Sequence, residues 1–103
     1  MVAVVYSTIG DIVDARRIAN ILVEEQLVAC VNIIPNVESI YRWEGKIDSD
    51  KEVVLIAKTK DENIKQTINR IKSLHTYELP DIMVLPVVGG LKDYLDYIYN
   101  ETT

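Results

Sequence analysis

Three side chains that could do chemistry lie close together in the second half of the chain: His75, Tyr77 and Glu78. Imidazole and carboxylate groups can both bind a transition metal, and Cu²⁺ heads the affinity series for almost any site of nitrogen and oxygen donors. The structural alternative is that His75 ends the preceding helix, where the helix dipole favours a positive charge. The local pattern alone favours this structural role over a metal site.

A second group of candidates lies on the predicted strands. Tyr41 and Trp43 are two residues apart, so on a strand they share one face and could stack against a planar ligand. The alternative is that this pair packs in a core or an interface. Lys58, at the end of a strand, could meet an anionic ligand or could be solvated. Cys30 lies within an apolar strand, which predicts a buried and unreactive thiol.

No arrangement typical of a catalytic site stands out. The chain has one histidine and one cysteine, which excludes a histidine-rich metal site and an internal disulfide. No Ser-His-Asp or Cys-His arrangement is evident. The sequence also lacks the basic and aromatic strand residues of an RNA-recognition domain and the paired cysteines of a metallochaperone. We therefore expect a protein that is not an enzyme.

Length and charge narrow the class of protein further. The 103 residues fit a single domain, 1–103, and 49% of them are hydrophobic, which is enough for a core. A net charge of -5 argues against nucleic acid and against an anionic membrane surface, because both require clustered Lys and Arg. No apolar run of about 18 residues predicts a membrane span. The sequence opens on a strand without a signal-peptide pattern, and its single cysteine fits a reducing compartment, so we expect a cytoplasmic location.

The hydrophobic pattern predicts four strands and three helices. Strands are expected at 2–7, at 28–34 with a continuation over 37–43 beyond Pro35, at 52–59 and at 82–88. Helices are expected at 11–26 and 61–74, capped by Asp11 and Asp61. A short last helix contains Leu91, Tyr94, Leu95 and Ile98. A turn or bulge is expected within 44–51, and the acidic stretch 48–52 is expected to be a solvated turn.

The order of these elements predicts the topology. With right-handed crossovers, the two βαβ halves interleave into a four-stranded antiparallel sheet of order 4-1-3-2, with two helices on one face, an α+β sandwich. The prolines agree with this order. Pro35 and Pro86 fall in the two predicted edge strands, where a missing N–H group is tolerated.

The face of the sheet that lacks helices predicts self-association. This face should carry polar side chains if it met water, yet the strands are apolar on both sides. Four strands of about five residues project roughly 300 Å² on that face. An exposed apolar patch of this size is a recognition surface or an aggregation hazard. The short last helix can cover only part of it, so a second copy of the chain is the simplest cover.

Three segments of the sequence together resemble the divalent-cation tolerance protein family (CutA). They are Ala-Cys-Val-Asn-Ile-Ile-Pro at 29–35, Ser-Ile-Tyr-Arg-Trp-Glu-Gly-Lys-Ile at 39–47 and His-Thr-Tyr-Glu-Leu-Pro-Asp-Ile at 75–82. Shorter matches at 52–53, 58–59 and 94–95 extend the resemblance over nearly the whole chain. The Tyr-x-Trp-x-Gly-Lys and His-x-Tyr-Glu-x-Pro segments are specific in combination.

The resemblance implies a ferredoxin-like fold and a tight homotrimer akin to the PII signalling proteins. It also implies a loose link to copper and other divalent cations, bound weakly and without established catalysis. By this resemblance His75 and Glu78 are candidate metal ligands, and the inter-subunit cleft is lined by Tyr41, Trp43, Lys58, Tyr77 and Tyr94. Three positions depart from the family pattern: Thr76 replaces the usual proline, Asp81 replaces a glutamate, and Ser7 stands where some members carry cysteine.

The predicted strand order separates the candidates within one subunit. His75 and Glu78 precede strand four, whereas Tyr41 and Trp43 lie on strand two, at the opposite edge of the sheet. Two intervening strands separate the groups by roughly 14 Å at ~4.8 Å per step, so we expect them to meet only between subunits of a cyclic trimer. Three alternatives stay open: a PII-like signalling or structural trimer without a physiological metal, a trimer with an unidentified protein partner, and an uncharacterised enzyme.

Overall fold

The computed structural model describes residues 1–103 and contains four strands and three α-helices. The strands are β1 (Val2–Ile9), β2 (Cys30–Trp43), β3 (Lys46–Lys60) and β4 (Ile82–Pro86). The helices are α1 (Ile12–Glu24), α2 (Ile64–Leu74), which follows a single 3-10 turn (Asp61–Asn63), and α3 (Lys92–Asn100). None of these helices is both long enough and apolar enough to span a membrane.

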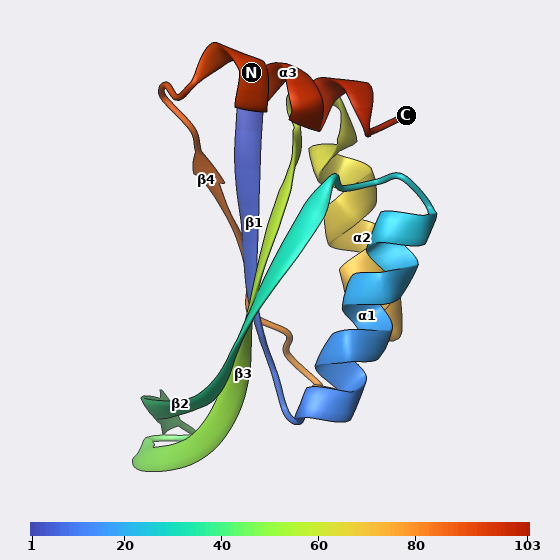
Figure 1. Ribbon diagram of the computed structural model, residues 1–103. Helices are drawn as coiled ribbons and strands as arrows, with labels where there is room; N and C mark the ends of the chain where they lie inside the picture. Colours follow the sequence, from blue (N-terminus) through green and yellow to red (C-terminus); the bar gives the residue numbers. More distant parts are fainter.

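The sheet has the predicted topology. Its strand order is β2-β3-β1-β4, and every neighbouring pair is antiparallel. Helices α1 and α2 pack side by side on one face of the sheet (Figure 1). Pro35 and Pro86 lie in the edge strands β2 and β4, as expected from their missing N–H groups. The predicted α+β, ferredoxin-like fold is confirmed.

One face of the sheet packs against the helices and forms the core of the protein. We call this the helix face; its strand residues include Val5, Ile9, Val53, Leu55 and Ala57. They pack against Ala15, Ile18 and Leu22 of α1 and Ile71 of α2, whose spacing of three or four residues places them on one side of each helix. Leu55, Leu22 and Ile18 are at most 1% exposed, so a single chain fully covers this face.

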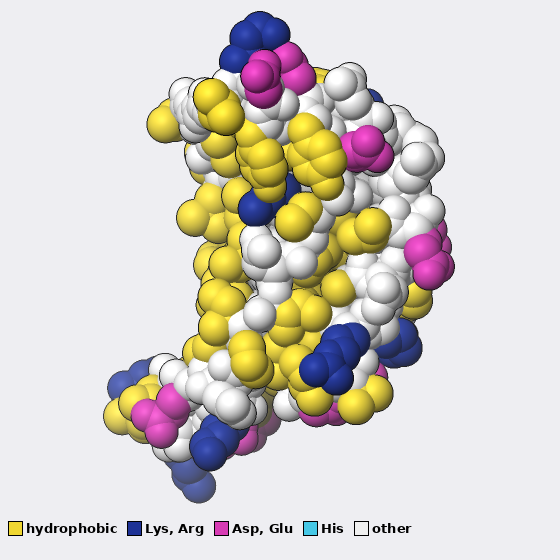
Figure 2. All heavy atoms as spheres, in the orientation of Figure 1, with side chains coloured by type: hydrophobic (Ala, Val, Ile, Leu, Met, Phe, Trp, Pro, Cys, Tyr) yellow, Lys and Arg dark blue, Asp and Glu magenta, His cyan; other side chains and the backbone are white.

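The opposite face, which we call the open face, carries the alternate residues of the same strands. Val4, Tyr6 and Thr8 of β1 lie on it, level with partners on β3 and β4. Ile34, Met83 and Leu85 remain 46%, 58% and 49% exposed. Figure 2 shows hydrophobic side chains gathered along the hollowed side of the molecule away from α1 and α2. The prediction of a second apolar face that one chain does not fully cover is confirmed, with the exposure concentrated on the edge strands.

Helix α3 covers one end of the open face. It crosses the ends of β1 and β3 (Figure 1), where Ile98 is buried. Val4 and Lys58 lie beneath it and line a cavity together with Tyr94 and Leu95 of the helix. Away from this helix the edge strands of the open face remain exposed at Ile34, Met83 and Leu85, as the length of the helix suggested.

Beyond the core, β2 and β3 continue as a long hairpin, which we call the hairpin arm (residues 37–52). The strands run to Trp43 and from Lys46, and the turn is Glu44-Gly45, with φ angles of 50° and 78°. The predicted solvated turn over 48–52 is therefore wrong, because Asp48, Asp50 and Glu52 belong to β3. Charged residues are rare in strands, but here the ladder to β2 holds them outside the core.

A bulge gives the hairpin arm its direction. The pairing of β2 with β3 shifts between Ile34 and Val37, and Asn36 adopts a left-handed φ of 59°. A bulge inserts residues on one strand only and so bends and twists the ladder. The arm consequently curves away from α1 and α2 (Figure 1). The predicted continuation of the strand over 37–43 is confirmed, but the predicted interruption at Pro35 is a bulge within one continuous strand.

The two predicted helix caps have different outcomes. The carboxylate of Asp11 accepts a hydrogen bond of 2.8 Å from the Asp14 amide, which confirms it as the cap of α1. Asp61 does not cap α2; it begins the 3-10 turn and forms an ion pair of 3.3 Å with the amino group of Met1. The Asp61 carboxylate, which was expected to accept hydrogen bonds from the first amides of α2, is instead paired with the Met1 amino group.

Cys30 differs from its prediction in the single chain. It lies at the start of the edge strand β2, directly opposite Lys58 of β3, and is only partly buried. Lys58 lies on the open face, and so does Cys30 opposite it. The burial of the Cys30 thiol therefore depends on what covers the open face.

Candidate functional site

The loop between α2 and β4 is fixed to the end of β1 by His75. The Nε2 atom of His75 lies 2.8 Å from the carbonyl oxygen of Thr8, and Nδ1 accepts a hydrogen bond of 3.1 Å from the Tyr77 amide. A carbonyl oxygen only accepts and an amide N–H only donates, so in this arrangement Nε2 acts as the donor and Nδ1 as the acceptor. His75 is also the C-cap residue of α2, and its amide donates to the carbonyl oxygen of Ile71.

Two further hydrogen bonds place the loop against the sheet. The Tyr77 hydroxyl donates to Glu52 at 2.6 Å, and the Thr8 hydroxyl donates to Asp81 at 2.6 Å. Tyr77 packs closely on Gly10, where an added Cβ atom would lie 3.3 Å from the tyrosine ring. The loop therefore bridges the end of β1 and the base of the hairpin arm.

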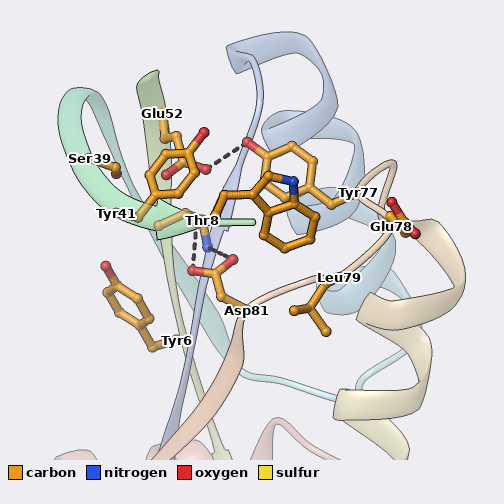
Figure 3. Close-up of a pocket in the computed structure, with 10 residues that line it drawn as sticks. Tyr6, Thr8, Ser39, Tyr41, Glu52, Tyr77, Glu78, Leu79 and Asp81 are labelled. Atoms are coloured by element: carbon orange, nitrogen blue, oxygen red, sulfur yellow. Dashed lines mark hydrogen bonds between the residues drawn. The ribbon is translucent and has the colours of Figure 1, made fainter. Parts of the chain in front are cut away.

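The loop, the hairpin arm and the open face enclose a pocket of about 470 Å³. Its walls come from Tyr6 and Thr8 of β1, from Ser39, Tyr41, Trp43 and Glu52 of the arm, and from Tyr77, Glu78, Leu79 and Asp81 of the loop and its end. Figure 3 shows the rings of Tyr6, Tyr41 and Tyr77 around the carboxylates of Glu52 and Asp81. We call this space the arm pocket.

The arm pocket corrects one geometric prediction. Tyr41 and Trp43 were expected to be separated from His75 and Glu78 within one subunit. Glu78 nevertheless lines the same pocket of a single chain as Tyr41 and Trp43, whereas His75 does not line it. The estimate from strand spacing treated β2 as a flat edge strand. The hairpin arm instead extends past the other strands, and its bend brings its pocket-facing residues toward the loop.

The tyrosines of the arm pocket are held by carboxylates. Tyr41 donates a short hydrogen bond to Asp50, and this bond, with burial and nearby negative charge, raises the pKa of Tyr41 to about 12. Burial and the bond to Glu52 raise the pKa of Tyr77 still further above its ordinary range. Both hydroxyls therefore remain protonated donors at neutral pH, and each carboxylate retains oxygen lone pairs for another partner.

Lys58 and Tyr94 do not join this pocket. They line a separate cavity of about 390 Å³ beneath α3, with Val2 and Val4 at the start of β1. The Lys58 ammonium group donates a hydrogen bond of 3.1 Å to the Tyr94 hydroxyl and lies 5.3 Å from the centre of its ring. The five residues that the family resemblance assigned to one cleft thus divide between two cavities at opposite ends of the open face.

The residues proposed as metal ligands do not form a metal site within one chain. Both ring nitrogens of His75 are bonded to the backbone, and Glu78 is exposed on the loop. No group of three or more His, Cys, Asp and Glu side chains converges anywhere in the chain. A ligand role for His75 would require the loss of one of its two bonds.

Several pocket residues were missed by sequence reasoning. Tyr6 and Thr8 alternate on β1, and their period of two was the available signal for a shared face. Glu52 matched the family pattern without an assigned role, and Asp81 was noted only as a departure from it. No local pattern could show that they meet the loop, because their contacts join residues 25 and 73 positions apart.

Comparisons with known proteins identify the family and agree with this fold. A family model described as CutA1 divalent ion tolerance protein matches residues 3–101. This chain belongs to the CutA1 divalent ion tolerance family. Divalent-cation tolerance protein CutA of Thermus thermophilus is 46% identical over 88 residues, which are 85% of each chain. The protein of that name from Archaeoglobus fulgidus is 40% identical over 94 residues, 91% of each chain.

Solved structures of the CutA1 family superpose closely on this chain. The divalent cation tolerance protein of Thermus thermophilus has a TM-score of 0.97 at 43% identity and covers both chains completely. CutA1 of Oryza sativa has a TM-score of 0.96 at 38% identity, covering 99% of this chain and 94% of that one. The chain spans about half the length of curated plant relatives. Chloroplastic CutA of Arabidopsis thaliana is 40% identical over 96% of this chain, and the matched region is 54% of the plant protein.

Proposed function

We propose that this CutA1-family chain is a non-catalytic binding protein that works as a homotrimer and takes a divalent cation or a small ligand at the arm pocket. The observation that carries the binding role is the pocket of about 470 Å³, which is built by hydrogen bonds between distant segments. Pockets of several hundred Å³ with a few fixed polar groups are typical ligand sites.

The trimer is supported by the exposed side chains of the open face. Ile34, Met83 and Leu85 form apolar rows that one chain leaves open, and both β2 and β4 are edge strands with unpaired backbone groups. A closed cyclic assembly would cover these edges and would place neighbouring subunits at the open side of the arm pocket.

The cation of the family name enters this proposal as a weakly held ligand. Cu²⁺ binds almost any pair of nitrogen and oxygen donors, and the exposed Glu78 carboxylate of the arm pocket is free to contribute one. We propose that further ligands come from a neighbouring subunit, because a single chain supplies no cluster of three.

The absence of catalysis and a cytoplasmic location are parts of the same proposal. The only imidazole has both nitrogens bonded, so it is not free to act as a general base. The single cysteine fits a reducing compartment. Turnover in a broad substrate screen would contradict the first statement, and cell fractionation tests the second.

Light scattering and a copper titration test the proposal together. We expect a mass about three times 11.7 kDa at micromolar concentration, and a saturable quenching of Trp43, the only tryptophan, by Cu²⁺. Glu78→Gln should remove the quenching, and His75→Ala should preserve it in protein that stays folded. A monomer would overturn the trimer. Quenching lost with His75→Ala alone would return to His75 the ligand role that the sequence suggested.

A further inference from the structure

The charge of the arm pocket is one-sided. Glu52, Glu78 and Asp81 line it, and Asp48 and Asp50 precede Glu52 at alternate positions on the same side of β3. No Lys or Arg side chain lines it. The pocket therefore carries a local excess of negative charge, which attracts a cation and repels an anion.

Glu52 is the carboxylate that most needs a positive partner. It is only 9% exposed, and its known contact is one hydrogen bond from the neutral Tyr77 hydroxyl. None of the ion pairs of the chain includes Glu52 or Asp81. A nearly buried carboxylate without a counter-ion is unfavourable, because the attraction of an opposite charge normally offsets the loss of water around it.

Aromatic rings make up the rest of the pocket wall. Tyr6, Tyr41, Trp43 and Tyr77 all face it. The negative faces of such rings attract a cation that keeps alkyl groups around its charge, and Trp is the most effective of them. A bare divalent ion gains little from aromatic rings, because its affinity comes from several converging oxygen or nitrogen ligands. The chain has no such cluster.

From these contacts we propose that the arm pocket binds an organic ammonium ion, with its alkyl groups against the aromatic rings and its charge compensating Glu52 and Asp81. The inference rests on the proposed binding function and names the ligand class for the same pocket. Tyr41 and Tyr77 stay protonated beside their carboxylates, so their hydroxyls hold the walls without adding positive charge.

The test compares choline with its neutral isostere, 3,3-dimethylbutan-1-ol, on the purified protein. Trp43 is the only tryptophan and lines the pocket, so its emission reports occupancy directly, and calorimetry gives an independent affinity. We expect a saturable change in emission with choline. The isostere should bind at least about tenfold more weakly, which is the range of a desolvated cation–π contact.

Two isosteric variants separate the pocket charge from the general charge of the chain. Glu52→Gln keeps the shape and an acceptor for Tyr77 but removes the negative charge, and should weaken choline binding by about tenfold. Glu38 lies on the other side of the hairpin arm, opposite Lys51, so Glu38→Gln should leave the affinity for choline unchanged. Equal loss in both variants would overturn the inference.

The remaining outcomes distinguish this inference from the proposed function. Equal binding of choline and the neutral alcohol would reject the ammonium class but keep a small-ligand pocket. Binding of Cu²⁺ without choline would also reject the inference and leave the metal part of the proposed function standing. Binding of none of the three probes by a folded trimer would overturn the inference, and with it the binding role assigned to the pocket.

Discussion

Leu55 and Leu85 lie in the same sheet but meet different surroundings. Leu55, on the helix face, is 1% exposed and packs in the main core, whereas Leu85, on the open face, is 49% exposed. The sequence pattern makes both faces apolar, but only one is covered by the helices of the same chain. The difference shows that the helix face forms the core of the subunit, whereas the edge strands of the open face keep apolar side chains exposed in a single chain.

The largest expected effect is on folding and assembly, and it comes from placing one charge on the helix face and one on the open face. Leu55→Asp should unfold the subunit, because a buried unpaired carboxylate costs several kcal/mol. Leu85→Asp should leave the circular dichroism spectrum native while lowering the mass measured by light scattering. If Leu85→Asp unfolded the protein as completely as Leu55→Asp, the two faces would not have separate roles.

A smaller effect is expected from two buried threonines near the helix face. The Thr67 hydroxyl is fully buried without a hydrogen-bond partner, whereas the Thr59 hydroxyl donates to the Leu27 carbonyl at 2.6 Å. Thr67→Val should raise the free energy of unfolding by about 1 kcal/mol, and Thr59→Val should lower it by a similar amount. Denaturant unfolding measures both, and opposite signs are required because the substitutions are otherwise the same.

Thiol labelling tests whether the open face is covered in solution. Cys30 is partly exposed in the single chain, so its burial in the protein would come from a neighbouring subunit. We expect slow reaction with a thiol reagent in the native protein and severalfold faster reaction in Leu85→Asp. Rapid stoichiometric labelling of the wild-type oligomer would show that the Cys30 end of the open face lies outside the interface.

The smallest effect is spectroscopic and concerns the arm pocket. The hydrogen bond to Asp50 raises the pKa of Tyr41 to about 12, and the pKa of Tyr77 is also raised. A raised folded-state pKa stabilises the fold below the unfolded value of about 10, and this contribution is lost as the pH rises through the folded value. Tyrosinate absorbance should show three of the six tyrosines, Tyr41, Tyr77 and Tyr99, ionising late. Tyr41→Phe should remove one of them; an unchanged titration would contradict the Asp50 contact.

The sequence by itself determined the topology, the edge positions of the prolines, the Asp11 cap and the apolar character of the open face. These features follow from local rules: a period of two on strands, a period near 3.6 on helices, and the missing N–H group of proline. Residues such as Val5 and Leu55 could be placed on a buried strand because their neighbours along the chain carry the signal.

Only the tertiary structure decided which candidates meet. The left-handed Asn36 and the register shift bend the hairpin arm, and so Tyr41 and Trp43 share a pocket with Glu78 although β2 and β4 are opposite edges of the sheet. The bonds of His75 to Thr8 and to the Tyr77 amide turn a predicted ligand into an anchor of the loop. Local spacing encodes which face a side chain takes, but the curvature of an arm and long-range hydrogen bonds depend on the folded chain as a whole.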